Sequence, residues 1–207
     1  MRETLQEVML VPDKCLADGD PNLLTNLMMK QLSIWTIGHS TQSADAFVAA
    51  LQSFDIQILV DVRSFPGSRR CPHFNKENLR ASLLDAGIDY IHMSEIGGRR
   101  KAKADSHNVA WRNESFRGYA DYMETEAFRA GIDRLIEIAG ASRTAIMCAE
   151  AVWWRCHRSL IADFLKARGA EVVHILGRDK SKEHPFTSAA RIVNGELSYR
   201  GVLETLE

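Results

Sequence analysis

The sequence has few cysteines, almost no net charge and no long hydrophobic run. Four cysteines among 207 residues are too few for a disulfide scaffold, so we expect free thiols or ligands in a reducing cytoplasm. A net charge of -1 argues against a generic nucleic-acid coat protein. No run of roughly 18 apolar residues could cross a bilayer, and the amino terminus lacks a secretory signal pattern. We therefore expect a cytoplasmic globular protein with no membrane partner.

The chain divides into an N-terminal extension and one folded domain. Residues 1–32 carry scattered Pro, Gly and Asp with no sustained period, which indicates an appendage outside the core. From 33 to 207, strand and helix patterns alternate, which is typical of a single α/β domain. The predicted strands are the apolar runs 34–37, 56–62, 88–92, 144–148 and 171–176.

Helical spacing of apolar residues separates these strands. Ser43 and Asn75 are suitable N-caps for two of the helices. Because βαβ crossovers are right-handed, the pattern predicts a three-layer fold: a mostly parallel sheet of about five strands with helices on both faces. Asn194-Gly195 between two alternating runs predicts a C-terminal hairpin that closes an edge or a flap.

Polar residues follow the carboxyl ends of the predicted strands. In a parallel sheet these ends share one edge, so side chains far apart in sequence meet there. As groups that could react we single out His39, Cys148, Glu150, Cys156 and His157. As groups that could hold a substrate we single out Ser40, Asp61, Arg63, Ser68, Arg69, Arg99 and Arg158.

Several of these residues fall in ordered motifs that carry a resemblance. The motifs are Thr36–Thr41, Val60–Arg63 with Pro66 and Ser68-Arg69, Gly97–Arg99, and Cys148–Glu150 followed by Cys156–Arg158. In these motifs the chain resembles the bacterial domain-of-unknown-function family 488. The resemblance covers about residues 33–176 and implies an α/β domain whose edge residues form one site. It implies no settled activity.

Arginine is the dominant residue type at the predicted edge. Guanidinium groups bind phosphate and carboxylate oxygens through paired hydrogen bonds, so the expected ligand is an anionic small molecule or nucleotide. Asp61 lies inside a hydrophobic strand, and we expect it to be hydrogen-bonded, to Arg63 or to a backbone amide, because a buried unpaired carboxylate is costly.

The thiols allow two further interpretations. Cys156 precedes a helix and neighbours His157 and Arg158, and such surroundings lower the pKa of a thiol and make it a nucleophile. The two cysteines and His157 could also ligate zinc or iron. Cys148 and Cys156 are too far apart in sequence for a zinc knuckle, and further ligands would have to come from Cys71, His73, His92 or His39. We therefore assign no metal ligands, and the sequence identifies no cofactor.

Two classes of function fit these residues best. The first is an enzyme, a hydrolase or transferase that acts on a phosphorylated or nucleotide-like substrate through Cys156, Glu150 or His39. The second is a nucleic-acid binding or processing module. There the basic segment 97–112, a candidate lid, would meet phosphates, and Trp153 and Trp154 would stack on bases. A metal-binding Cys/His site is the third possibility.

Overall fold

The computed structural model describes Met29 and residues 31–201. Residues 1–28, 30 and 202–207 lie outside the described residues, and almost all of the predicted N-terminal extension falls among them.

A six-stranded, mostly parallel sheet forms the centre of the fold. Its strands are β1 (Ser33–Gly38), β2 (Ile58–Asp61), β3 (Asp89–His92), β4 (Thr144–Cys148), β5 (Glu171–Gly177) and β6 (Lys180–Glu183), in the spatial order β3-β2-β4-β1-β5-β6. The first five pair in parallel, and β6 runs antiparallel to β5. This confirms the predicted α/β class and all five predicted strands.

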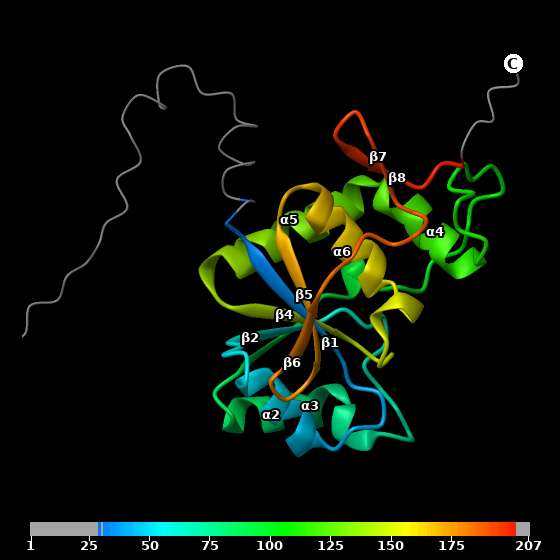
Figure 1. Cartoon of the computed structure of the whole chain (residues 1–207). Helices are drawn as coiled ribbons and strands as arrows, with labels where there is room; N and C mark the ends of the chain where they lie inside the picture. The colour runs from blue at the N-terminus through cyan, green and yellow to red at the C-terminus, as the bar shows by residue number, and fades with distance from the viewer. Residues whose placement is uncertain (1–28, 30, 202–207) are drawn as a thin grey trace, which may run out of the picture.

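Helices cover both faces of the sheet (Figure 1). Helices α2 (Ala44–Gln52) and α3 (Lys76–Asp85) lie on one face, and α4 (Glu114–Met123), α5 (Glu126–Ala141) and α6 (Arg158–Ala167) lie on the other. Successive residues of a strand point to opposite faces, so each strand supplies two hydrophobic cores. In β4, Met147 packs toward α2 and α3, whereas Ile146 and Cys148 pack toward α4 and α6.

Of the two predicted N-cap residues, one makes a capping hydrogen bond and the other does not. Ser43 caps α2 as predicted, because its hydroxyl accepts a hydrogen bond from the Ala46 amide at 3.2 Å. Asn75 occupies the N-cap position of α3 but makes no capping bond. Its side-chain oxygen instead accepts from the Ser68 amide at 2.6 Å, so Asn75 folds the loop that follows β2.

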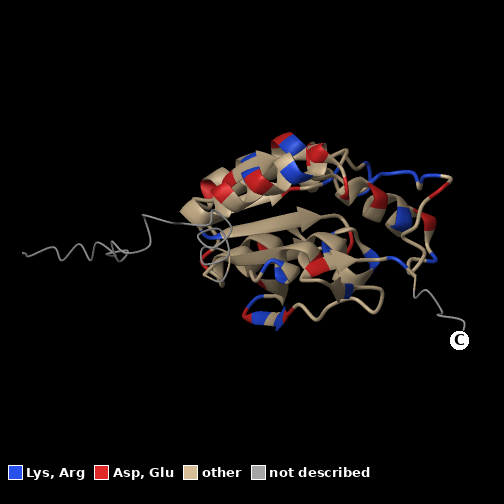
Figure 2. Ribbon diagram, turned by 90° about the horizontal axis from the view of Figure 1, so that it is seen from above, with Lys and Arg blue, Asp and Glu red and all other residues tan. Residues whose placement is uncertain are grey.

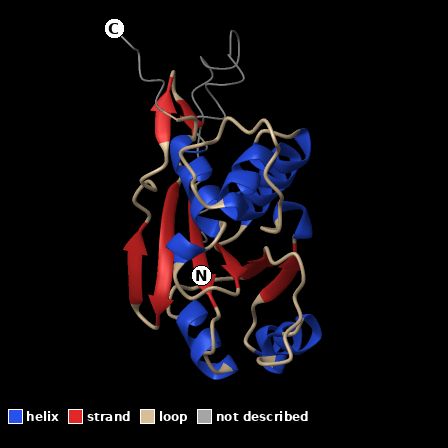
Figure 3. Ribbon diagram, turned by 90° about the vertical axis from the view of Figure 1, so that its right-hand side faces the viewer, coloured by secondary structure: helices blue, strands red, loops and turns tan. Residues whose placement is uncertain are grey.

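The C-terminal hairpin is present, and one edge strand was not predicted. Strands β7 (Arg191–Val193) and β8 (Glu196–Ser198) form a separate two-stranded sheet (Figure 3). Their turn has φ of 52° at Asn194 and 83° at Gly195, as a type I′ turn requires. β6 has a charged, fully exposed sequence without apolar alternation, so periodicity could not reveal it.

Charged residues lie mainly on the helices and loops, and the parallel strands carry few (Figure 2). Within the described ranges, the helices are all too short or too polar to span a bilayer.

Candidate functional site

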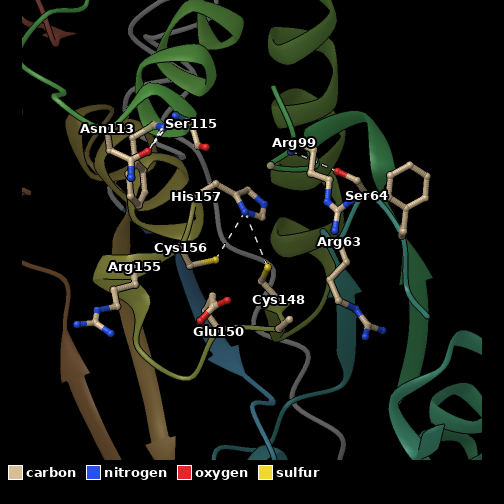
Figure 4. Close-up of a pocket in the computed structure, with 14 residues that line it drawn as sticks. Arg63, Ser64, Arg99, Asn113, Ser115, Cys148, Glu150, Arg155, Cys156 and His157 are labelled. Carbon is tan, nitrogen blue, oxygen red and sulfur yellow. Dashed lines mark hydrogen bonds between the residues drawn. The ribbon is translucent and has the colours of Figure 1, made fainter. Parts of the chain in front are cut away.

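A pocket of about 410 Å³ opens at the carboxyl edge of the sheet. Its walls come from the loops after β2, β3 and β4, from the start of α4 and from the turn that leads into α6. Six of the predicted site residues line it: Arg63, Arg99, Cys148, Glu150, Cys156 and His157. The parallel topology therefore brings together four segments that are distant in sequence, as Figure 4 shows.

Two thiols and an imidazole form the floor of this pocket. The Nδ1 atom of His157 lies 3.6 Å from the Cys156 sulfur and 3.8 Å from the Cys148 sulfur (Figure 4). Both cysteines are free and buried. Cys148 is the last residue of β4, and Cys156 follows the short 3₁₀ helix η4 (Trp153–Arg155) at the start of α6. The end of β4 and the turn before α6 thus bring both sulfurs close to the same imidazole nitrogen.

The ring of His157 is fixed in one orientation. Its Nε2 lies 3.2 Å from the carbonyl oxygen of Val62, which can only accept, so Nε2 carries a proton. In the neutral ring Nδ1 then has a free lone pair that faces the two sulfurs. Tyr119 packs against the ring at a centroid distance of 5.1 Å. Gly98 lies so close that a Cβ there would come within 2.3 Å of Nδ1.

The two thiols differ in acidity. Burial raises the pKa of Cys156, but the hydrogen bond from Cys148 and the nearby His157 and Arg158 outweigh it and bring that pKa well below the usual range. The hydrogen bond to Cys156 and burial raise the pKa of Cys148. Cys156 therefore loses its proton first and is the better nucleophile of the pair.

Charged groups surround the mouth of the pocket. Arg99, Glu150 and Arg155 are exposed. Arg99 lies over the ring of Phe65 at 5.4 Å, and its backbone amide donates to the Ser64 hydroxyl at 3.4 Å. The first turn of α4 also borders the pocket, capped by Asn113, whose side-chain oxygen accepts from two amides of that turn. Arg99 and two helix amino termini thus border the same space, which favours an anion, whereas the guanidinium group of Arg155 points away from the sulfurs (Figure 4).

Arg63 lines the pocket, but its guanidinium group points away from the floor (Figure 4). It donates to both carboxylate oxygens of the fully buried Asp61, at 2.6 to 3.1 Å, and to the Phe74 carbonyl oxygen at 2.9 Å. Burial lowers the pKa of Arg63, but the carboxylate of Asp61 outweighs burial, and the pKa is raised. The expected hydrogen bond between Arg63 and Asp61 is confirmed, and it occupies the donors that an anion would need.

Six further predicted site residues do not line the pocket. His39 is buried against Phe74, donates through Nδ1 to the Ser40 carbonyl oxygen at 2.8 Å and contacts Arg63 through Nε2. Ser68 accepts from the Cys71 amide at 3.1 Å, which shapes the loop after β2. The remaining predicted residues outside the pocket lining are Ser40, Asp61, the exposed Arg69 and the buried Arg158.

Arg158 lies behind the pocket and begins a buried polar chain that the sequence did not reveal. It donates to the Glu150 carbonyl oxygen at 2.6 Å and to the Thr36 hydroxyl at 3.2 Å. From Thr36 the hydrogen-bonded series of side chains continues to His174, then to His184 and finally to the buried carboxylate of Asp163. Its three hydrogen bonds are 2.7 to 2.9 Å long. These residues are spread over β1, β5, α6 and the position that follows β6, so no local motif marks them.

Two other expectations concern aromatic residues and the segment 97–112. Trp153 is buried and stacks on His174 at 4.4 Å, whereas Trp154 is 55% exposed, so the two do not form an exposed pair. Segment 97–112 is tied to α4, because the buried Asp121 accepts hydrogen bonds from Lys103, Ser106 and Asn108. Those bonds give this segment a fixed position beside the pocket.

The further metal ligands considered from sequence lie elsewhere. Among the described residues, the group that could hold an ion consists of Cys148, Cys156 and His157. His73, His92 and His39 each bond a backbone carbonyl oxygen, as does the thiol of Cys71.

The sequence model of the family described as "Domain of unknown function DUF488" matches residues 43–165. The chain belongs to this family. The match runs from α2 into α6 and therefore includes every pocket-lining residue, whereas the motif Thr36–Thr41 precedes it. No curated protein and no solved structure matches the chain.

Proposed function

We propose that the protein is an enzyme that binds a phosphorylated or nucleotide-like substrate in the pocket. The supporting observation is the combination of charged groups at its mouth with reactive groups at its floor. Arg99 and Arg155 border the space above Cys148, Cys156 and His157. The volume, about 410 Å³, falls in the range of small-molecule and cofactor sites.

The residues divide into three roles in this proposal. Arg99 and the amino termini of α4 and α6 hold the anionic group. The reacting groups are Cys156, the more acidic thiol, together with Cys148, His157 and Glu150. Arg63 and Asp61 support the wall from behind, and His39 packs beside them. The cytoplasmic location stays a prediction of the sequence.

A nucleic acid is the competing ligand, and the pocket favours a small anion over it. Stacking bases needs an exposed aromatic surface. Of the two tryptophans only Trp154 offers one, and Phe65 in the pocket lining adds a single exposed ring, which is little for a run of stacked bases. Binding to a phosphate backbone also weakens steeply with salt, whereas binding of one phosphate group depends on salt much less.

The proposal is tested by thermal shift with inorganic phosphate, pyrophosphate, AMP and a single-stranded oligonucleotide at two salt concentrations. A small anion should raise Tm in the wild type. Arg99→Ala should weaken its binding about 10-fold or more, the usual effect of losing a hydrogen bond to a charged group. The matched control is Arg80→Ala, which removes an exposed arginine on α3.

Equal Tm shifts in the Arg99→Ala and Arg80→Ala variants would remove Arg99 from the site. Stabilisation by the oligonucleotide alone, lost at the higher salt concentration, would replace the proposed substrate class with nucleic acid.

A further inference from the structure

The floor of the pocket has the composition and spacing of a metal centre. We propose that Cys148, Cys156 and His157 bind one divalent transition-metal ion, with Zn²⁺ the best match to two thiolates and an imidazole. The proposal rests on the proposed function for its substrate, but it makes Cys148, Cys156 and His157 ligands of the ion, which would then be the reacting centre in place of a free thiol. Binding of the ion itself is tested without any substrate.

Distances between the three side chains fit a tetrahedral ion. A zinc ion lies about 2.3 Å from a thiolate and about 2.0–2.1 Å from an imidazole nitrogen. At a tetrahedral angle these bonds place sulfur and nitrogen about 3.5–3.6 Å apart. Here the His157 Nδ1 atom lies 3.6 Å and 3.8 Å from the two sulfurs. All three donor atoms lie within 4.8 Å of one another, so an ion can reach them with little movement.

The surroundings of His157 match those of a metal ligand. A ligating histidine usually donates its other ring N–H to a carbonyl or carboxylate oxygen, which fixes the tautomer. The Nε2 of His157 lies against the Val62 carbonyl oxygen at 3.2 Å, which leaves Nδ1 free to coordinate. Gly98 and Tyr119 pack against the ring and hold its plane. The imidazole is therefore already aimed at the point between the sulfurs.

Charge is balanced when an ion is bound at this place. Cys148 and Cys156 are 9% and 4% exposed, and a pair of buried thiolates would be costly without a compensating charge. One divalent ion neutralises two thiolates. Because ligands must lose their protons, loading the site should release thiol protons to the buffer.

The described residues supply three protein ligands, which is typical of a catalytic zinc site rather than a structural one. Since all three ligands line the pocket, the fourth position faces the space where Arg99 and Arg155 lie. A water molecule or an oxygen of the anionic substrate would occupy it. A bound ion would thus account for the two thiols and the imidazole that lie below the arginines at the mouth of the pocket.

The experiment uses the full chain with Cys15→Ser and Cys71→Ser, which leaves the two proposed thiols as the only ones. The protein is stripped with a chelator under reducing conditions and titrated with Co²⁺. We expect thiolate-to-cobalt charge-transfer bands and tetrahedral ligand-field bands that saturate at one equivalent. Zn²⁺ should displace the cobalt and abolish these bands.

Single changes in that background identify the ligands. Loss of a residue that only hydrogen-bonds a metal ligand weakens metal binding by about 10–100-fold. Cys148→Ser, Cys156→Ser and His157→Gln each remove a ligand itself, so each should weaken Zn²⁺ binding by more than that. Circular dichroism of the ion-free variants shows whether they are folded. Absence of cobalt bands in the folded double variant would overturn the proposal, as would unchanged Zn²⁺ binding after Cys156→Ser.

The metal site and the substrate pocket can fail separately. AMP-dependent Tm shifts are measured on the ion-free and the Zn²⁺-loaded protein. Zn²⁺ binding without any AMP effect contradicts the proposed substrate class and leaves the metal site in place. An AMP effect without cobalt or zinc binding contradicts the metal site alone.

Discussion

Arg63 follows a buried strand, where a ligand-binding arginine is expected, yet its guanidinium group bonds within the protein. Asp61 is fully buried, and a buried carboxylate is tolerated only when it is paired and hydrogen-bonded. Arg63 supplies that pair, and the hydroxyl of Tyr90 adds a hydrogen bond of 2.7 Å. The fold itself therefore needs this arginine, and the proposed function assigns contact with the anion to the exposed Arg99.

Gly98 gives a prediction at the scale of one residue. A Cβ at this position would lie 2.3 Å from Nδ1 and 2.5 Å from Cγ of His157, so Gly98→Ala must displace the imidazole. Its bond to the Val62 carbonyl oxygen resists that movement. We expect the free energy of unfolding to fall by about 1–3 kcal/mol, the usual cost of overpacking. Urea denaturation at pH 7 measures it.

Gly67→Ala is the matched control for that change. A Cβ at Gly67 would meet nothing within 4 Å, and neither glycine has a positive φ. This control should change stability by no more than about 0.5 kcal/mol. Equal stability of the two variants would show that His157 can move freely.

At the scale of elements, apolar periodicity located the five parallel strands and the helices between them. It works there because each strand is buried on both faces and each helix on one. β6 has no such pattern, since its four residues are exposed and it is held by backbone hydrogen bonds to β5. Asn75 shows a second limit: its place before α3 follows from propensity, but its bond to Ser68 depends on the loop.

Asp163 on α6 connects several elements through one buried carboxylate. It accepts hydrogen bonds from His184, from the Thr187 amide and hydroxyl and from Tyr199, at 2.6 to 2.9 Å. Asp163→Asn places an amide group among these donors and removes the charge. We expect a loss in the free energy of unfolding of about 1–3 kcal/mol for each buried donor left without an acceptor, measured by urea denaturation.

The control for Asp163→Asn is Asp133→Asn on α5. Asp133 is 63% exposed and lies 3.8 Å from Arg168, so its loss should cost at most about 1 kcal/mol. Similar effects of the two changes would mean that the buried carboxylate contributes no more than a surface charge.

At the scale of the whole molecule, the carboxyl-edge rule predicted which segments meet but not which face each side chain joins. Strand alternation separates them: Cys148 lies with Ile146 on the side of α4 and α6, whereas Leu59 and therefore Asp61 lie on the side of α3. That part of the division could have been drawn from the sequence. The contact between His157 and the two sulfurs could not, because it depends on how η4 folds back before α6.

Two buried histidines predict how the stability of the whole molecule depends on pH. Burial, chiefly, lowers the pKa of His39 from 6.5 to about 4 and that of His174 to about 2. Above pH 6.5 both are neutral in the folded and the unfolded chain, so their contribution to stability is fully present. Below pH 6.5 the unfolded chain binds protons that the folded chain excludes, and stability falls with pH.

Each histidine should change the free energy of unfolding by up to about 1.4 kcal/mol per pH unit below pH 6.5. For His39 this dependence extends down to about pH 4, and for His174 it extends to lower pH. Urea denaturation at steps between pH 7.5 and pH 4 measures the slope. His39→Gln should reduce it within this window, because one of the two titrating groups is gone. If the wild type and His39→Gln have the same slope, His39 is protonated in the folded protein, and its hydrogen bond to Arg63 cannot persist at acidic pH.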